Sequence, residues 1–181
     1  MALKSTIFKA DLQLADLDRG YFAEHALTIA RHPSETDERM MVRVLAFALH
    51  AGQDLAFGKG ISSDEEAALW EIDPSGIIRL WIEVGQPDET RIRKACSKAD
   101  KVVVIAYGAR AVDVWWQQIS GTLARFDNLE VWRLTADEGQ ALASLAERTM
   151  KLSCTIQEGT IWLAAGERSI ELRPVCISGA G

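Results

Sequence analysis

The chain has 181 residues, of which 48% are hydrophobic and 25% charged, and its formal net charge at pH 7 is -6. This length suits one hydrophobic core, and the composition lies far from that of disordered chains. No stretch has the composition of an interdomain linker, so we expect a single domain over residues 1–181. The negative net charge opposes nonspecific attraction to phosphate backbones, and nucleic-acid binding would have to depend on a local site.

The longest unbroken apolar runs are short, such as Val102 to Tyr107, whereas a membrane span needs about 20 apolar residues. The N-terminal residues 1–4 lack the apolar core and cleavage site of a signal peptide. We therefore expect a cytoplasmic protein that contacts no membrane. The cysteines at positions 96, 154 and 176 have no paired spacing, which predicts reduced core thiols instead of disulfides or a zinc site.

The first third of the chain predicts a hairpin and then a helix. Residues 3 to 15 and 21 to 31 alternate or nearly alternate apolar and polar side chains, with a turn-forming segment between them. The pattern changes at Pro33, which suits the first turn of a helix. Apolar residues then recur at helical spacing as far as Leu49, so we expect an amphipathic helix that ends near Gly52.

The later elements alternate between helix and strand. In chain order they are predicted as strands at 67–72 and 77–84, a helix capped by Asp88, a strand at 102–107, a helix around 112–126, a strand at 129–134, a helix at 136–148, and strands at 149–157, 160–164 and 169–177. The first two strands form a hairpin because Asp73 to Gly76 favours a type I turn. The middle elements predict a parallel β-α-β crossover, and the last three strands predict a meander. We expect strands from both chain ends to pair in a second sheet.

The fold class expected from this order is α/β, with a helix, a strand hairpin and then alternating helix and strand. Mainly antiparallel strands from the N-terminal hairpin and the C-terminal meander flank this core. The order resembles the restriction-endonuclease-like core of PD-(D/E)XK nucleases, which is of the α-β-β-β-α-β type and contains a mixed sheet.

Three segments carry a resemblance to a known family. They are HPSETDERMMVR from His32, LWIEVGQPDETRIRKA from Leu80, and the adjacent pair Trp115-Trp116. On these segments the chain resembles the YaeQ family, a variant of the PD-(D/E)XK phosphodiesterases, over nearly its whole length. The resemblance implies a nuclease-like fold, but fold alone does not fix chemistry.

In nucleases of this class an acid on one strand and the acid of an E-x-K motif on the next strand hold Mg²⁺, which activates water. Glu83 matches the glutamate of the family motif. In the strand at 77–84 the even positions are all apolar, so Glu83 lies on the opposite face with Arg79 and Trp81. It is the main candidate for catalysis and for binding Mg²⁺ or Mn²⁺, and the alternative is a solvated carboxylate at the end of a strand.

The cation of the E-x-K motif is missing, because Gly85 occupies the lysine position. The resemblance suggests that Gln86 belongs to the altered motif, where an amide can hydrogen bond to phosphate or water. Arg91 or Lys94 on the next helix is the candidate source of positive charge, and a basic solvated face is the alternative for each.

The acid expected on the preceding strand is also missing, because alignment on Trp70 places Ala68 at the metal-ligand position. Asp64, Glu65 or Glu66 would reach the site only after a register slip or a folded-back loop. This departure argues against an intact metal site.

The first helix offers one more carboxylate for a metal. Glu38 lies on the apolar side of that helix, so its partner is either a metal ion or an internal arginine or backbone donor. Glu35 precedes Arg39 by four residues and is expected to form a helical ion pair with it.

The sequence leaves two functions open. The first is a Mg²⁺- or Mn²⁺-dependent phosphodiesterase acting on nucleic acid, with Glu83 and Glu38 as metal ligands, Gln86 orienting water or phosphate, and Arg91 or Lys94 supplying charge. The second is a nuclease-fold protein without catalysis that binds nucleic acid or a protein partner in gene regulation. Nucleotide-binding fingerprints are incomplete, so no organic cofactor is predicted.

Overall fold

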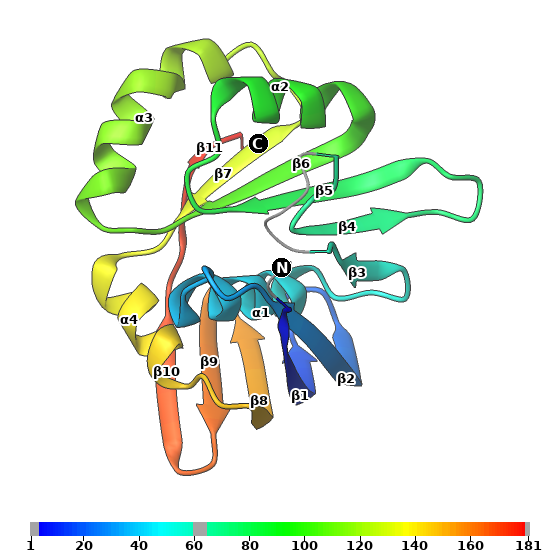
Figure 1. The fold of residues 1–181 in the computed structure, drawn as a ribbon, viewed down its shortest axis with the longest axis vertical. Helices are drawn as coiled ribbons and strands as arrows, with labels where there is room; N and C mark the ends of the chain where they lie inside the picture. The colour runs from blue at the N-terminus through cyan, green and yellow to red at the C-terminus, as the bar shows by residue number, and fades with distance from the viewer. Residues whose placement is uncertain (1–3, 60–64, 180–181) are drawn as a thin grey trace.

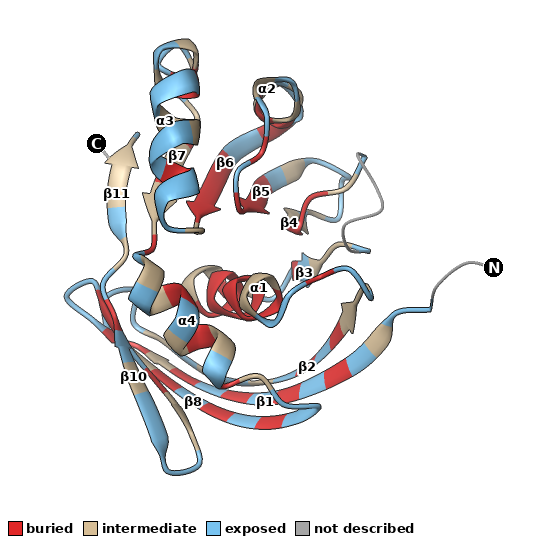
Figure 2. Ribbon diagram, turned by 60° about the vertical axis from the view of Figure 1, so that its left-hand side comes forward, coloured by how far each residue is buried: buried red, intermediate tan, exposed pale blue. Residues whose placement is uncertain are grey.

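The computed structural model describes residues 4–59 and 65–179. These residues form a mixed α/β fold of two mixed sheets and four helices. The helices are α1 (Asp37–His50), α2 (Glu89–Lys98), α3 (Arg110–Leu123) and α4 (Ala136–Ser144). Figures 1 and 2 show a layered arrangement in which α1 and α4 lie between the two sheets, while α2 and α3 cover the far side of one of them.

The five-stranded sheet combines both ends of the chain. Its strands are β1 (Thr6–Asp16), β2 (Tyr21–Arg31), β8 (Thr149–Gln157), β9 (Thr160–Ala165) and β10 (Arg168–Leu172). They are ordered β10-β9-β8-β1-β2, with β1 antiparallel to β2 and parallel to β8. The predicted N-terminal hairpin and its pairing with strands from the C-terminal part of the chain are therefore confirmed, within the described residues.

The six-stranded sheet carries the β-α-β crossover. Its strands are β3 (Leu55–Phe57), β4 (Leu69–Ile72), β5 (Ile78–Val84), β6 (Ala99–Ala106), β7 (Leu129–Arg133) and β11 (Val175–Ser178). They are ordered β11-β7-β6-β5-β4-β3, and the central strands β5, β6 and β7 are parallel. The crossover through α2 and the β4-β5 hairpin were both predicted from the sequence.

Helix α1 is buried on more sides than its sequence pattern suggested. Thr36 caps its N-terminus by accepting a hydrogen bond from the Arg39 backbone N–H. All residues from Met40 to Ala48 are buried. A helix between two sheets contacts apolar side chains on opposite sides, so an apolar stripe on one side alone would leave polar groups in the core.

One predicted strand is wrong in its extent. Residues 169–177 were expected to form a single strand, but the segment divides into β10 in one sheet and β11 in the other. Pro174 lies at the division, and proline cannot donate a ladder hydrogen bond. The backbone N–H of Arg173 instead donates to the Glu138 carboxylate on α4.

One smaller difference concerns the loop that follows α1. The short strand β3 was not predicted, and its three residues pair with β4. Two predicted positions, residue 3 of the first strand and Asp64, lie outside the described residues.

The three cysteines are free thiols, but only Cys154 lies in the core as predicted, whereas Cys96 and Cys176 are half-buried. Burial raises the pKa of Cys154 to about 12 and that of Cys96 to about 11, so both remain protonated at neutral pH. Within the described ranges, no helix has the length and apolar character required to cross a membrane.

A buried ion pair anchors the start of α1. Glu35 is 3% exposed and Arg43 is 1% exposed. Arg43 donates through Nε to Glu35 Oε1 and through Nη2 to Glu35 Oε2, each at 2.8 Å. The same Nη2 donates to the carbonyl of Ala30, which ties α1 to β2. Burial lowers the pKa of Arg43 from its ordinary value, and the adjacent Glu35 carboxylate opposes this shift.

We predict that Arg43→Met lowers the free energy of unfolding by about 3–5 kcal/mol, because Glu35 then loses its bidentate partner while it stays buried. Glu35→Gln should cost a similar amount. The double variant should lose less than the sum of the two single losses. Urea unfolding measures all three variants. Arg79→Met, which removes an exposed arginine on β5, is the control and should change stability little; additive losses at positions 35 and 43 would contradict the coupling.

Candidate functional site at the end of strand β5

A pocket of about 240 Å³ lies at the C-terminal end of β5. It is lined by Arg39, Ala68, Glu83, Val84, Gln86, Pro87 and Arg91. Ligands of open α/β sheets commonly bind beyond the carboxyl ends of the strands, which is where this pocket lies. Three of the predicted site residues, Glu83, Gln86 and Arg91, are brought together here.

Glu83 is held inside the protein by two donors. Its side chain is on the same face of β5 as Trp81, as the sequence predicted, and Trp81 Nε1 donates to Glu83 Oε1 at 2.7 Å. Arg91 Nη2 lies 2.9 Å from the same oxygen. Glu83 is only 3% exposed, so the alternative of a solvated strand-end carboxylate is wrong. Helix α2 covers this face of the strand.

Arg91 connects three parts of the pocket. It lies in the first turn of α2, where the predicted cap Asp88 accepts a hydrogen bond from the Arg91 backbone N–H. Its Nη2 donates to the carbonyl of Glu66 at 2.8 Å as well as pairing with Glu83. The side chain is 23% exposed, so the guanidinium is oriented by the protein and still reaches the pocket.

Gln86 is positioned by the loop after β5. Its Nε2 donates to the carbonyl of Tyr107 at 2.6 Å, and its side chain lies against Gly108. A Cβ added at Gly108 would lie 2.5 Å from Gln86 Nε2, and the backbone there has a φ of +119°. Gly85 also has a positive φ, of +96°, a backbone conformation that favours glycine at this position.

Arg39 is a site residue that the sequence analysis missed. It lines the pocket from α1, its side chain is 19% exposed, and its Nη1 donates to Glu35 Oε1 at 2.8 Å. The expected Glu35–Arg39 ion pair is therefore confirmed, but Glu35 is buried and shared with Arg43. The spacing of Glu35, Arg39 and Arg43 at four-residue intervals was the signal for this network.

Guanidinium groups outnumber carboxylates among the described residues that line or support the pocket. Of these residues, Arg39, Arg43 and Arg91 face Glu35 and Glu83. Because Arg43 is buried and satisfies both oxygens of Glu35, the positive charge that reaches the pocket comes from Arg39 and Arg91. The local field therefore favours an anion despite the negative net charge of the chain.

Two predicted site residues lie elsewhere. Lys94 does not line the pocket, and its ammonium pairs with Glu65. Glu38 packs against Gly139 of α4, where a Cβ on that glycine would lie 2.2 Å from Glu38 Oε1. Burial raises the pKa of Glu38 from its ordinary value. Neither residue is placed beside Glu83.

The donor set does not suit a divalent metal. Mg²⁺ is usually bound by carboxylates, carbonyls and water, but Ala68 lines the pocket at the position aligned with a ligand, and Glu83 is already paired with a cation. Over residues 4–59 and 65–179, no group of three or more histidine, cysteine, aspartate or glutamate side chains has an arrangement that could hold a metal. Glu66 does not replace the absent acid, because its carboxylate accepts from the backbone N–H of Lys59.

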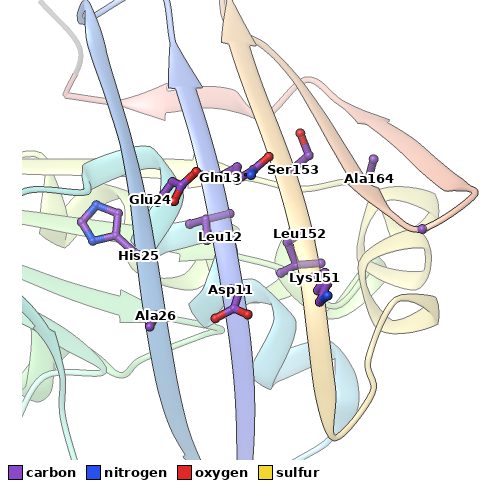
Figure 3. Close-up of a pocket in the computed structure, with 11 residues that line it drawn as sticks. Asp11, Leu12, Gln13, Glu24, His25, Ala26, Lys151, Leu152, Ser153 and Ala164 are labelled. Carbon is purple, nitrogen blue, oxygen red and sulfur yellow. Dashed lines mark hydrogen bonds between the residues drawn. The ribbon is translucent and has the colours of Figure 1, made fainter.

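A second, larger hollow of about 650 Å³ lies on the outer face of the five-stranded sheet. Figure 3 shows Gln13, Ser153 and Ala164 in one row across β1, β8 and β9, with Lys151 and Asp11 nearby. The charged groups in this hollow have opposite signs. They do not point toward one shared point, as the charged groups in the pocket at the end of β5 do.

The model of the YaeQ protein family matches residues 1–174 of this chain. The chain belongs to the YaeQ family. The protein named Uncharacterized protein YaeQ of Salmonella typhi is 49% identical over 175 residues, and the match covers 96% of each chain. The protein of the same name in Escherichia coli K12 is 46% identical over 172 residues, with 95% of each chain covered.

Solved YaeQ structures have the same fold. The crystal structure of the YaeQ protein from Xanthomonas axonopodis pv. citri matches with a TM-score of 0.94 and 45% identity, covering 97% of this chain and 99% of that one. The YaeQ protein from Pseudomonas syringae matches with a TM-score of 0.91 and 36% identity, covering 97% of both chains. The names of these relatives state no chemical activity, and the pocket at the end of β5 is the feature of this chain that indicates a function.

We predict that Gly108→Ala lowers the free energy of unfolding by about 1–3 kcal/mol, because the new methyl group meets Gln86 in an unfavourable backbone conformation. Placed in a Gln86→Ala background, the same change should cost less, since only the backbone strain remains. Gly121→Ala on α3 is the control, where the space is open and alanine should stabilise by about 0.5–1 kcal/mol. Equal losses at position 108 in both backgrounds, measured by urea unfolding, would show that Gln86 is not fixed there.

Proposed function

We propose that the pocket at the end of β5 binds a phosphate group of a nucleic acid and does not cleave it. The observation that carries this proposal is the pairing of Glu83 with Arg91 beside Ala68. The carboxylate that would hold a metal in a nuclease serves here to orient a guanidinium. A phosphate is the anion that the remaining groups suit best.

Two guanidiniums from different helices favour phosphate as the ligand. Arg39 extends into the pocket from α1 and Arg91 extends into it from α2, so a phosphate in the pocket has a guanidinium donor from each helix. Guanidinium groups bind phosphate oxygens through planar, charge-assisted hydrogen bonds. Each of the two is oriented by a carboxylate, which reduces the conformational entropy lost on binding.

Nucleic acid is the proposed source of the phosphate because of where the pocket lies. The order α1, β3, β4, β5, α2, β6 resembles the α-β-β-β-α-β order of PD-(D/E)XK nucleases, and Glu83, which lines the pocket, matches the glutamate of the family motif. The net charge of -6 limits binding to this local site. We therefore expect weak binding that engages few phosphates.

A metal-dependent phosphodiesterase is the second candidate, favoured by the meeting of Glu83, Gln86 and Arg91 in one pocket. It requires Mg²⁺ or Mn²⁺ to displace Arg91 from Glu83 and to find its other ligands in backbone carbonyls or water. Lys94 would need to leave Glu65 to contribute charge. The two candidates give opposite results when the Glu83 carboxylate is removed.

We predict that Arg39→Gln and Arg91→Gln each weaken binding of labelled single- and double-stranded DNA and RNA about tenfold, measured by fluorescence anisotropy. The slope of log affinity against log salt should also become shallower by about 1. Arg79→Gln removes the same charge at the other end of β5 and should bind as the wild type does. Arg91→Lys should retain part of the affinity, and equal losses at positions 79 and 91 would refute a local site.

We predict that Glu83→Gln strengthens oligonucleotide binding severalfold, because it removes a negative charge from the pocket and keeps an acceptor for Trp81 Nε1. The wild type should neither bind Mn²⁺ in a calorimetric titration nor cleave the oligonucleotides. Mn²⁺ binding and cleavage by the wild type, both lost in Glu83→Gln, would establish the phosphodiesterase instead.

A further inference from the structure

A further cavity, partly open to solvent, lies between the two sheets, beside the C-terminal end of α1. Its volume is about 230 Å³, and most of its lining is apolar. The apolar side chains come from α1, from both sheets and from the segment between β10 and β11: Leu49, Ile105, Trp132, Ile156, Ile161 and Pro174. Cavities lined in this way, with a few convergent polar groups, are typical sites for small organic ligands.

His50 supplies a polar group without a partner in this cavity. It is the last residue of α1, its side chain is half-buried, and among the described residues none is seen to hydrogen bond to its ring nitrogens. Burial lowers the pKa of His50 to about 4, and the positive charges of Lys101 and Arg19 act in the same direction, against Glu130 and Asp16. The imidazole is therefore neutral at pH 7, with one donor and one acceptor nitrogen. A partly buried polar group of this kind can accept a hydrogen bond from a ligand in the cavity.

The charges that line the cavity restrict the ligand. Three carboxylates line it, those of Asp16, Asp18 and Glu130, and Arg19 is the cation among the lining residues. Arg19 pairs with Asp16, whose side chain is 3% exposed. Asp18 accepts from the backbone N–H groups of Glu158 and Gly159, which fixes its negative charge at the rim. An anionic ligand would meet net repulsion here, and an uncharged or cationic one would not.

We propose that this cavity binds a small aromatic molecule, uncharged or positively charged, that donates a hydrogen bond to His50. A cavity of about 150 Å³ lined by aliphatic and aromatic side chains accommodates benzene, so the larger volume here suits a bicyclic ring of about ten non-hydrogen atoms. This site is separate from the pocket at the end of β5 and does not depend on the function proposed for that pocket. Its lining residues and those of the β5 pocket have no member in common.

Three probes with the same ring test the proposal on the whole chain. Indole is uncharged, tryptamine is cationic and indole-3-acetate is anionic at neutral pH. Isothermal calorimetry should show binding of indole and tryptamine, with indole-3-acetate at least tenfold weaker. Methyl NMR spectra of the wild type should show shifts at Ile105, Ile156 and Ile161 on addition of indole. Absence of binding at millimolar indole, or shifts confined to residues elsewhere, would overturn the proposal.

Two variants test the contacts separately. His50→Phe keeps an aromatic ring but removes the acceptor, and it should weaken indole binding about tenfold. Leu49→Trp fills the cavity from its partly buried edge and should abolish binding, whereas Val114→Trp on the exposed side of α3 is the matched control and should not. If Leu49→Trp fails to fold, the indole affinity of His50→Phe and the methyl NMR shifts of the wild type still test the proposal. Unchanged indole affinity in His50→Phe would overturn the hydrogen bond that the proposal requires.

Discussion

The burial of helix α1 between two sheets is the constraint on which the rest of the structure depends. Residues 40–48 are buried, so polar chemistry on this helix is confined to its ends unless it is paired. Arg43 is the exception within the buried stretch, and Glu35 accepts hydrogen bonds from its Nε and Nη2, while its Nη1 is buried without a partner among the described residues. That pairing leaves Arg39 to carry positive charge outward at the N-terminal end. At the other end of the helix, His50 meets a largely apolar space.

The chemistry at the end of β5 follows from which cation pairs with which carboxylate. A glutamate beside a strand-end loop could bind a metal if its oxygens were available, but Glu83 Oε1 is taken by Trp81 and Arg91. The same contacts fix the Arg91 guanidinium toward the pocket. Ala68 offers no oxygen to a metal and the Arg91 guanidinium is oriented toward the pocket, so the described residues at the end of β5 suit an anion better than a cation.

The local sequence pattern was sufficient to predict the hairpins, the crossover and the face of β5 that carries Glu83. Each of these depends on alternating apolar and polar residues, or on apolar residues at helical spacing, within a short segment. It could not predict that α2 would bury Glu83, since burial depends on packing between distant elements. The division at Pro174 and the sharing of Glu35 by two arginines were missed for the same reason. The helical face of Glu38 and the family resemblance left a metal ion or an internal donor open as its partner, and neither could show that this face packs against α4.

The two sites at opposite ends of α1 are joined by a helix of 14 residues, which spans about 21 Å. Communication between them would require an element with two stable arrangements. Helix α1 is packed on both sides, and its Glu35–Arg43 pair and Thr36 cap hold its first turns to the rest of the fold. A rotation or shift of the helix would break buried hydrogen bonds at one end before it reached the other. The packing thus favours two independent sites, in which occupation of the His50 cavity leaves the arginines at the end of β5 in place.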